Sequence, residues 1–170
     1  IDEIQSEYCS AFGPAAETMN RYFAYWENYA MQNTMPFLDL YKDHVRRYAN
    51  YIRKAHLAFP PESFRLAEAI LNEAYDQART DPSPEFAERV RFIQVGLQHA
   101  QLACKLAAIF DGEKALPENK IEEAKQALRE LIAFRKKHEA MFFSDLLHVT
   151  SYWERPSIDV DALVASIAAE

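Results

Sequence analysis

The stretch FGPAAETMNRYFAYWENYAM, residues 12–31, decides the fold of this chain. Five large aromatic residues lie within eight consecutive positions of it. Gly13 allows an unusual backbone turn, and Pro14 suits the first position of a helix, where no backbone N–H is needed. Glu17 follows in the first turn, where the helix dipole favours a negative charge. We therefore predict a helix from about Pro14 to Gln32.

This predicted helix is amphipathic, because a rotation of about 100° per residue separates its apolar and polar side chains. One side carries Ala15, Met19, Tyr22, Phe23, Trp26, Tyr29 and Ala30. The other side carries Glu17, Asn20, Arg21, Ala24 and Asn28. The wide apolar side indicates a helix that packs against several neighbours.

The composition of the chain is typical of a soluble domain built from helices. Its 170 residues fit one domain, and a domain of that size buries roughly 70% of its unfolded surface. Glycine occurs three times and charged residues make up 26%, which favours helices over a turn-rich β fold. The net charge of −7 offers no basic face to a nucleic acid. No run of about 18 apolar residues indicates a membrane span.

The start of the chain and its two cysteines each leave a question open. The chain begins at Ile1 rather than at methionine, and no charged-then-apolar leader opens it. We interpret it as a piece of a longer protein or as a processed product, so the missing targeting signal says nothing about the compartment. Cys9 and Cys104 could form one disulfide, although two free, buried thiols are the favoured interpretation.

Proline and glycine divide the rest of the chain into further helices. Residues 2–8 resemble a short helix or the end of a preceding one. Beyond residues 14–32, the predicted long helices span about residues 39–58, 61–79, 84–110 and 117–138. The helix at 61–79 collects its apolar residues on one side, namely Leu66, Ala67, Ile70, Leu71, Ala74 and Ala78. The predicted fold is therefore all-α, an antiparallel multi-helix bundle of about five long helices, forming one domain over residues 1–170.

The boundaries of the later helices follow from local signals. Ser83 suits the N-cap of the helix that begins at Pro84, and Gly112 suits the C′ position after it ends. The charges of the helix at 117–138 match its dipole, with glutamates in its first two turns and Arg135, Lys136, Lys137 and His138 in its last turn. Residues 141–157 are apolar and aromatic without a clear period, and they could continue this helix briefly and then form an ordered loop. A short final helix starts at Asp159 or Asp161.

The helix at 84–110 has two apolar stripes on nearly opposite sides. The first stripe consists of Phe86, Val90, Ile93, Leu97, Ala100, Cys104 and Ala107, and the second of Phe92, Val95, His99, Leu102, Leu106 and Phe110. Only a narrow strip is polar, consisting of Gln94, Gln98, Gln101 and Lys105. A helix that is apolar on two sides is buried on two sides. It is therefore either the central helix of the bundle, or one side is a partner interface formed by Phe92, Val95, His99, Leu102 and Leu106.

The residues present no catalytic, cofactor or metal site. The five histidines, His44, His56, His99, His138 and His148, lack the Glu-x-x-His pairs of di-iron bundles, and Asp145-x-x-His148 is the nearest approach. His99 is better interpreted as a hydrogen-bonded core or interface residue than as a metal ligand. Three glycines could hardly build a phosphate-binding loop, and no Gly-x-Ser-x-Gly elbow occurs. Tyr25, Tyr152 and Trp153 could stack on sugars, although packing is the favoured interpretation.

Two parts of the chain resemble a known pattern. The string EYCSAFGPAAETMNRYFAYWENY matches it at Glu7, Tyr8, Phe12, Gly13, Ala15 and Ala16, followed by Tyr22, Phe23, Tyr25, Trp26 and Glu27. A later part matches it at Leu66, Ala69, Leu71, Ala74, Arg89, Val90, Phe92, Gly96, Leu97 and His99. The pattern resembles the helical region that follows the (β/α)8 barrel in bacterial glycoside-hydrolase-like proteins. These form a domain-of-unknown-function family distantly related to α-glucuronidases and hexosaminidases.

This resemblance covers roughly residues 3–107 and implies a function for the chain. The chain would be a non-catalytic accessory domain that packs on the upstream barrel of the same protein or on a second subunit. The parent protein would be exported and would break down polysaccharide, so carbohydrate is a partner only through the parent. Any catalytic carboxylates would lie in the barrel, before Ile1, and no cofactor is implied.

Two other classes of protein stay open. A stand-alone helical ligand-binding or protein-interaction module predicts a groove lined by tyrosines. A bundle enzyme requires histidine or carboxylate side chains that converge on one site, and the spacing of these residues nominates no such group.

Overall fold

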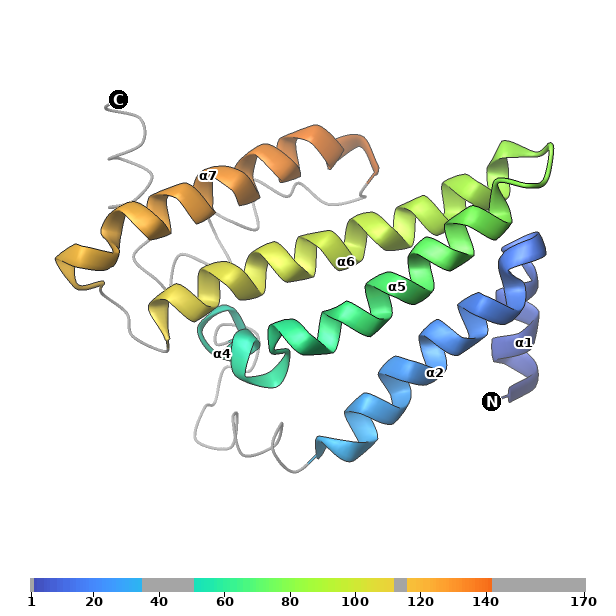
Figure 1. The fold of residues 1–170 in the computed structure, drawn as a ribbon, viewed down its shortest axis with the longest axis horizontal. Coiled ribbons are helices and arrows are strands. Elements are labelled where there is room, and N and C mark those ends of the chain that lie inside the picture. The colour runs from blue at the N-terminus through green and yellow to red at the C-terminus, as the bar shows by residue number, and fades with distance from the viewer. Residues whose placement is uncertain (1, 35–50, 112–115, 142–170) are drawn as a thin grey trace. The chain divides into compact units, whose positions relative to one another are not determined.

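The computed structural model describes residues 2–34, 51–111 and 116–141 (Figure 1). Every regular element within these ranges is a helix, so the predicted all-α helical bundle is confirmed. The elements are α1 (Asp2–Ser10), η1 (Gly13–Ala15), α2 (Ala16–Gln32), α4 (Tyr51–Ala58), α5 (Pro61–Ala78), α6 (Pro84–Phe110), η3 (Glu118–Lys120), α7 (Ile121–His138) and η4 (Glu139–Met141).

The helix boundaries agree closely with those predicted from the sequence. Both ends of α6 fall where they were expected, and α5 ends one residue before the predicted Arg79. The predicted helix at 39–58 is described only in its last part, which is α4. The predicted final helix and residues 142–157 lie outside the described residues.

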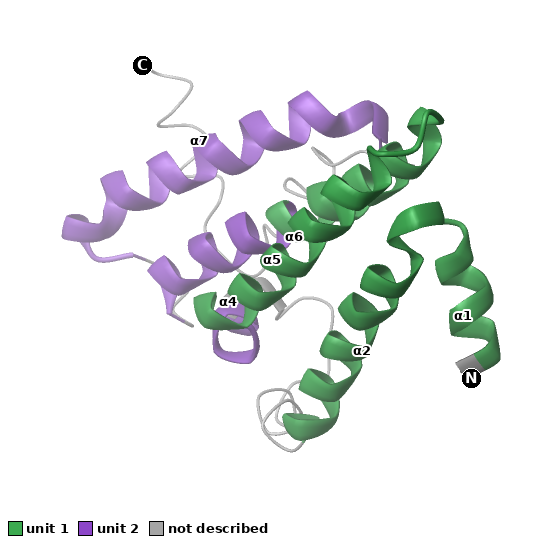
Figure 2. Cartoon of the chain, turned by 45° about the vertical axis from the view of Figure 1, so that its right-hand side comes forward, with its two compact units in different colours: residues 1–34, 61–98 green, residues 35–60, 99–170 purple. Residues whose placement is uncertain are grey.

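The chain divides into two compact units, and α6 belongs to both (Figure 2). Unit 1 comprises residues 1–34 and 61–98, and unit 2 comprises residues 35–60 and 99–170. The prediction of a single domain over residues 1–170 stays a prediction.

In unit 1, α2 and α5 lie side by side and run in opposite directions (Figures 1 and 2). The hydrogen bonds between them show this direction, because residues with higher numbers on α2 bond residues with lower numbers on α5. Thr18 Oγ1 donates to Gln77 Oε1 at 2.7 Å, and one turn later Arg21 Nη2 donates to Glu73 Oε1 at 2.6 Å. Near the other end of α5, the Tyr25 hydroxyl donates to the Ser63 carbonyl oxygen at 2.6 Å.

The interface between α2 and α5 differs from the predicted apolar sides at several positions. Met19 and Tyr22 of α2 are buried as expected, whereas Ala30 is exposed and Trp26 is half-buried. Leu66 was predicted on the inner side of α5, and its side chain is 53% exposed instead. The buried side of α5 is rotated away from Leu66 and includes Ser63, Phe64, Ala67, Ile70, Leu71, Ala74 and Ala78.

The turn between α1 and α2 depends on a glycine, as the sequence predicted. Gly13 has φ +55°, a left-handed conformation in which a side chain is strained. A Cβ atom at this position would lie 2.7 Å from Cδ2 of Phe86 on α6, so the ring fills the space beside the glycine. Arg89, three residues further along α6, donates a hydrogen bond to the carbonyl oxygen of Ala11. The N-terminal end of α6 therefore supports this turn.

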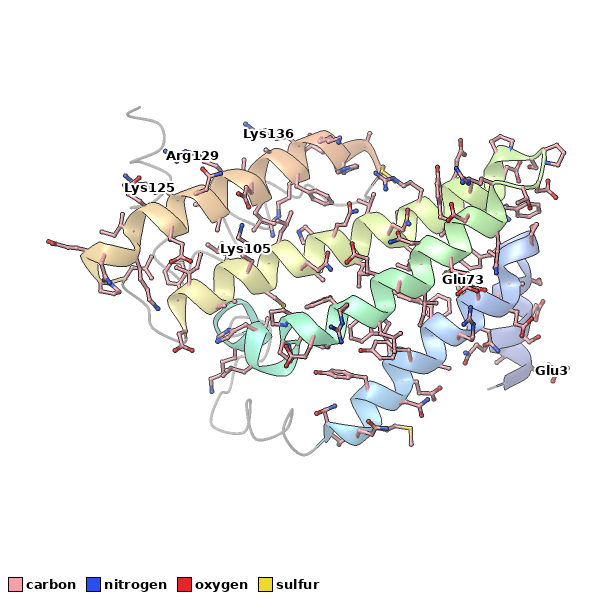
Figure 3. The ribbon with its side chains drawn as sticks, in the orientation of Figure 1. Glu3, Glu73, Lys105, Lys125, Arg129 and Lys136 are labelled. Carbon is pink, nitrogen blue, oxygen red and sulfur yellow. The ribbon has the colours of Figure 1, made fainter. Side chains whose placement is uncertain are left out.

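In unit 2, α7 packs antiparallel to the C-terminal part of α6. Lys105 Nζ lies 2.6 Å from Glu130 Oε2, and His99, earlier on α6, bonds Arg135, later on α7. Figure 3 labels Lys105 on the side of α6 that faces α7. The core between them consists of Ala103, Leu106, Ile109, Phe110, Ala124, Ala127, Leu128 and Leu131.

The C-terminal end of α6 is capped by a different residue from the predicted one. Asp111 has φ +47°, and its backbone N–H donates to the Ala107 carbonyl oxygen at 2.9 Å. This left-handed residue with its single bond to the preceding turn is the αL type of helix end. Asp111 therefore takes the conformation that was expected of Gly112, which lies outside the described residues. Aspartate adopts this conformation more readily than most residues because its short side chain can bond locally.

Candidate functional site

The predicted partner interface on α6 is largely covered by the chain itself. Val95 and Leu106 are completely buried, and His99 and Leu102 are half-buried. Leu106 belongs to the core between α6 and α7, and Leu102 packs against that core. Phe92 is the one residue of this predicted set with an exposed side chain, at 42%. The second apolar stripe is therefore mainly the surface on which helices of this chain pack.

The polar strip predicted on α6 begins with a buried residue. Gln94 is only 8% exposed, and its Nε2 lies 3.0 Å from Asn72 Oδ1 and 3.4 Å from the Leu71 carbonyl oxygen on α5. A buried amide needs such partners because leaving it unbonded is costly. Gln94 thus joins α6 to α5 rather than facing water.

Tyr25, the described member of the predicted sugar-stacking set, is used in packing. Its hydroxyl bonds the backbone of α5, and its ring lies 5.1 Å from the Trp26 ring and 6.2 Å from the Tyr29 ring. Trp26 in turn contacts the Phe64 ring at 5.9 Å. These contacts favour the packing interpretation of the aromatic run. Tyr152 and Trp153 lie outside the described residues.

A buried arginine and a histidine form the central polar contact of unit 2. Arg135 has no exposed surface, and its Nε donates to Nε2 of His99 at 3.0 Å. Arginine stays protonated in proteins, so Nε2 of His99 must be the acceptor and its proton must sit on Nδ1. His138, also buried, stacks on Phe134 with 4.6 Å between ring centroids. His99 is thus a half-buried, hydrogen-bonded residue between α6 and α7, which agrees with the sequence interpretation of a bonded core or interface residue.

A second histidine contact lies at the end of α6. His56 Nε2 is 3.1 Å from Asp111 Oδ1, and the His56 side chain is 11% exposed. An ionised aspartate accepts hydrogen bonds only, so Nε2 of His56 carries the proton. Nδ1 of His56 is buried and makes no hydrogen bond, alone among the buried side-chain nitrogens and oxygens in the described part of the chain. A carboxylate that orients a histidine in this way recurs at catalytic and metal sites.

No metal-binding cluster accompanies this pair in the parts of the chain that the structure describes. The described ranges contain no group of three or more His, Cys, Asp or Glu side chains that could hold a metal ion. Cys9 and Cys104 are both free and buried, as the favoured interpretation predicted. Burial raises the pKa of the Cys104 thiol to about 11, so it is a poor nucleophile at neutral pH.

A polar network joins α2 to α5 in unit 1. Arg21 donates to both Glu73 and Thr18, and Gln77 Nε2 donates to Glu73 Oε1 at 3.2 Å. The bond from Arg21 is the largest of the effects that lower the pKa of Glu73. Thr18 is buried, although the sequence pattern placed it on neither side of the helix. These polar groups stabilise a helix interface, and their geometry indicates no chemistry beyond that.

Large apolar side chains are exposed on α1, where the sequence analysis nominated no site. Ile4 is 72% exposed and Tyr8 is 54% exposed, one helical turn apart. An adjoining side of α1 is packed, with Cys9 buried and Gln5 Nε2 donating to Asn20 Oδ1 of α2 at 2.7 Å. The i, i+4 spacing of Ile4 and Tyr8 indicates that both lie on one side of a helix. The sequence of so short a helix does not show whether other helices of the chain pack on that side.

Comparison with protein-family models, curated proteins and solved structures gave no match. Among the described helices, none is both long enough and apolar enough to cross a membrane.

Proposed function

We propose that this chain is a non-catalytic helical accessory domain of a glycoside-hydrolase-like protein, and that it packs against a catalytic barrel or a second subunit. One observation carries the proposal. Six large apolar side chains are exposed among the described residues, and two of them, Ile4 and Tyr8, lie one helical turn apart on α1. The other four, Met31, Leu57, Leu66 and Phe92, each lie on a different helix.

Exposed apolar side chains support a partner when they are concentrated and held in place. Isolated ones are ordinary on any protein surface, whereas contiguous patches mark sites of interaction. Ile4 and Tyr8 share one side of α1, and the Tyr8 ring is held by edge contacts with Phe12 and Phe23. A side chain that is already fixed loses little entropy when a partner covers it.

The hydrogen bonds of the polar side chains support a non-catalytic role. Thr18, Arg21 and Glu73 link two helices of unit 1, and Gln94 links two others. In unit 2, Arg135 and His99 link α6 to α7. Each of these groups holds helices together instead of lining a common site.

The family part of the proposal rests on the resemblance at residues 7–27. Glu7 and Tyr8 of that string lie on α1, and Gly13 forms the turn that leads to the aromatic-rich α2. A stand-alone interaction module is the alternative, because the same exposed side chains could serve a partner encoded elsewhere.

Two measurements test the proposal. The sequence of the encoding gene upstream of Ile1 should contain several hundred residues with alternating strand and helix patterns, as a (β/α)8 barrel requires. In the longer gene product, amide hydrogen exchange in α1 should be slower than in the isolated chain. A gene that encodes no further domain, together with a monomeric chain in solution, contradicts the proposal and favours the alternative.

A further inference from the structure

We propose that the exposed side of α1 is the docking face of this domain and that its partner is a protein surface with an apolar centre and a basic rim. This inference rests on the proposed accessory function and names the surface and the partner chemistry that the function requires. Ile4 and Tyr8 form the apolar centre of the face, and Glu3 and Glu7 form its rim. All four side chains are exposed.

The position of α1 is determined by contacts on its other side. Cys9 is buried and Gln5 bonds Asn20 of α2, so Ile4 and Tyr8 cannot turn inward without breaking these contacts. The Tyr8 ring meets the Phe12 ring at 5.7 Å and the Phe23 ring at 5.5 Å, both edge-on. These contacts hold the Tyr8 ring and the adjoining side of α1 in place.

Acidic side chains outnumber basic ones on the segment that carries this face. Arg89 of α6 bonds the Ala11 carbonyl oxygen just after the end of α1, and it pairs with Glu85. Residues 2–34 contain five acidic side chains, at Asp2, Glu3, Glu7, Glu17 and Glu27, and one basic side chain, at Arg21. Arg21 is directed to α5, where it pairs with Glu73 at 2.6 Å. Figure 3 shows Glu3 pointing away from the helices at the far end of α1. Neither Glu3 nor Glu7 forms an ion pair in the described part of the chain.

This charge pattern selects among the possible occupants. A second copy docked by the same face would place acidic side chains opposite one another, and like charges facing each other across an interface cost several kcal/mol. A nucleic acid or an anionic lipid surface is repelled for the same reason. A protein surface with Lys or Arg around an apolar centre satisfies both the charge and the exposed side chains.

The test uses a synthetic amphipathic helical peptide of leucine and lysine as the probe, with a leucine–glutamate peptide as the control ligand. Binding is followed by backbone amide shifts of the full chain. We expect the lysine peptide to shift signals of α1 and the glutamate peptide to shift none. The variant carrying Glu3→Lys and Glu7→Lys should bind the lysine peptide about tenfold more weakly. Ile4→Ser should weaken it by a similar factor without changing the melting temperature.

A matched control exists on α5 of the same unit. Leu66 is exposed, and Glu62 and Glu68 near it are exposed as well. Two control variants make the same chemical changes away from α1. Leu66→Ser matches Ile4→Ser, and the double variant Glu62→Lys with Glu68→Lys matches the double lysine variant of α1. Both should leave binding of the lysine peptide unchanged. The control variants could weaken binding of the lysine peptide as much as the α1 variants do, or the amide shifts could spread over the whole chain. Either result would show a general electrostatic attraction and would reject the docking face.

Three further outcomes separate this inference from the proposed function. Self-association in sedimentation experiments that Ile4→Ser abolishes would identify α1 as a contact between copies and would overturn the basic partner. If the longer gene product contains a barrel but α1 fails to bind the lysine peptide, the accessory function survives and this face does not. The reverse result, binding at α1 with no further domain in the gene, rejects the accessory function alone.

Discussion

Nε of Arg135 donates a hydrogen bond to Nε2 of His99 at 3.0 Å, and the guanidinium group is completely buried. The bond joins α7 to α6 within unit 2, across 36 positions of sequence. A buried charge is tolerated only when polar groups surround it, because desolvation of an ion is expensive. His99 is one of these groups, and its neutral form accepts the bond.

We expect His99→Ala to destabilise the chain by about 1–3 kcal/mol, because the buried N–H of Arg135 loses its acceptor. The same substitution made in an Arg135→Met background should cost less, since no charge is then left unbonded. Urea denaturation of the four proteins of this double-mutant cycle measures the coupling. Lys137→Met, at an exposed position in the last turn of α7, is the control and should change stability little. Equal costs of His99→Ala in both backgrounds would show that the bond does not stabilise the fold.

Two glycines should respond to alanine with opposite signs. Gly13→Ala forces a side chain into a left-handed residue, at about 1–2 kcal/mol, and places its Cβ against the Phe86 ring. Gly96 lies inside α6 with no atom within 4 Å of the added Cβ, so Gly96→Ala should stabilise the chain by about 0.5–1 kcal/mol. Thermal unfolding of both variants checks the pair. Stabilisation by Gly13→Ala would disprove the turn geometry between α1 and α2.

The ion pair between Arg21 and Glu73 should contribute stability only at higher pH. The bond from Arg21 lowers the pKa of Glu73 below its ordinary value of 4.5. A carboxylate with a lowered pKa in the folded state stabilises it fully above the ordinary value, and the contribution disappears as the pH falls through the lowered value. Glu73→Gln should therefore lower the melting temperature at pH 7 and have a smaller effect at pH 3. An effect that grows on acidification would contradict this assignment.

The two thiols should be unreactive in the folded chain. Burial raises the pKa of both Cys9 and Cys104, the latter to about 11, and the thiolate is the nucleophile. For Cys104 at pH 8, about one molecule in a thousand carries the thiolate. A thiol reagent such as dithionitrobenzoate should report both cysteines after unfolding in guanidinium and react slowly before it. Cys9→Ser and Cys104→Ser variants assign any residual reaction to one position, and rapid labelling of folded Cys104 would be inconsistent with its burial.

The candidate site was only partly predictable. The position of His99 on an apolar stripe indicated a bonded core or interface residue, and the structure shows it half-buried and bonded to Arg135 between α6 and α7. Arg135 was expected to complement the helix dipole in the last turn of α7, and its complete burial was not foreseen. Gln94 was assigned to a polar strip, whereas the backbone of α5 opposite it provides partners that make burial favourable. The exposure of Ile4 and Tyr8 was also missed, because a short helix shows its pattern but not its neighbours.

Short-range signals in the sequence determined the helices of this protein. Pro84 starts α6, apolar periodicity carries it to Phe110, and Gly13 allows the turn ahead of α2, because each effect involves residues within about one helical turn. The tertiary structure alone decided which side of each helix is covered. Leu66 is exposed and Arg135 is buried because the rotation of a helix against its neighbours depends on side chains distant in sequence. The packing of α1 likewise leaves Ile4 and Tyr8 exposed.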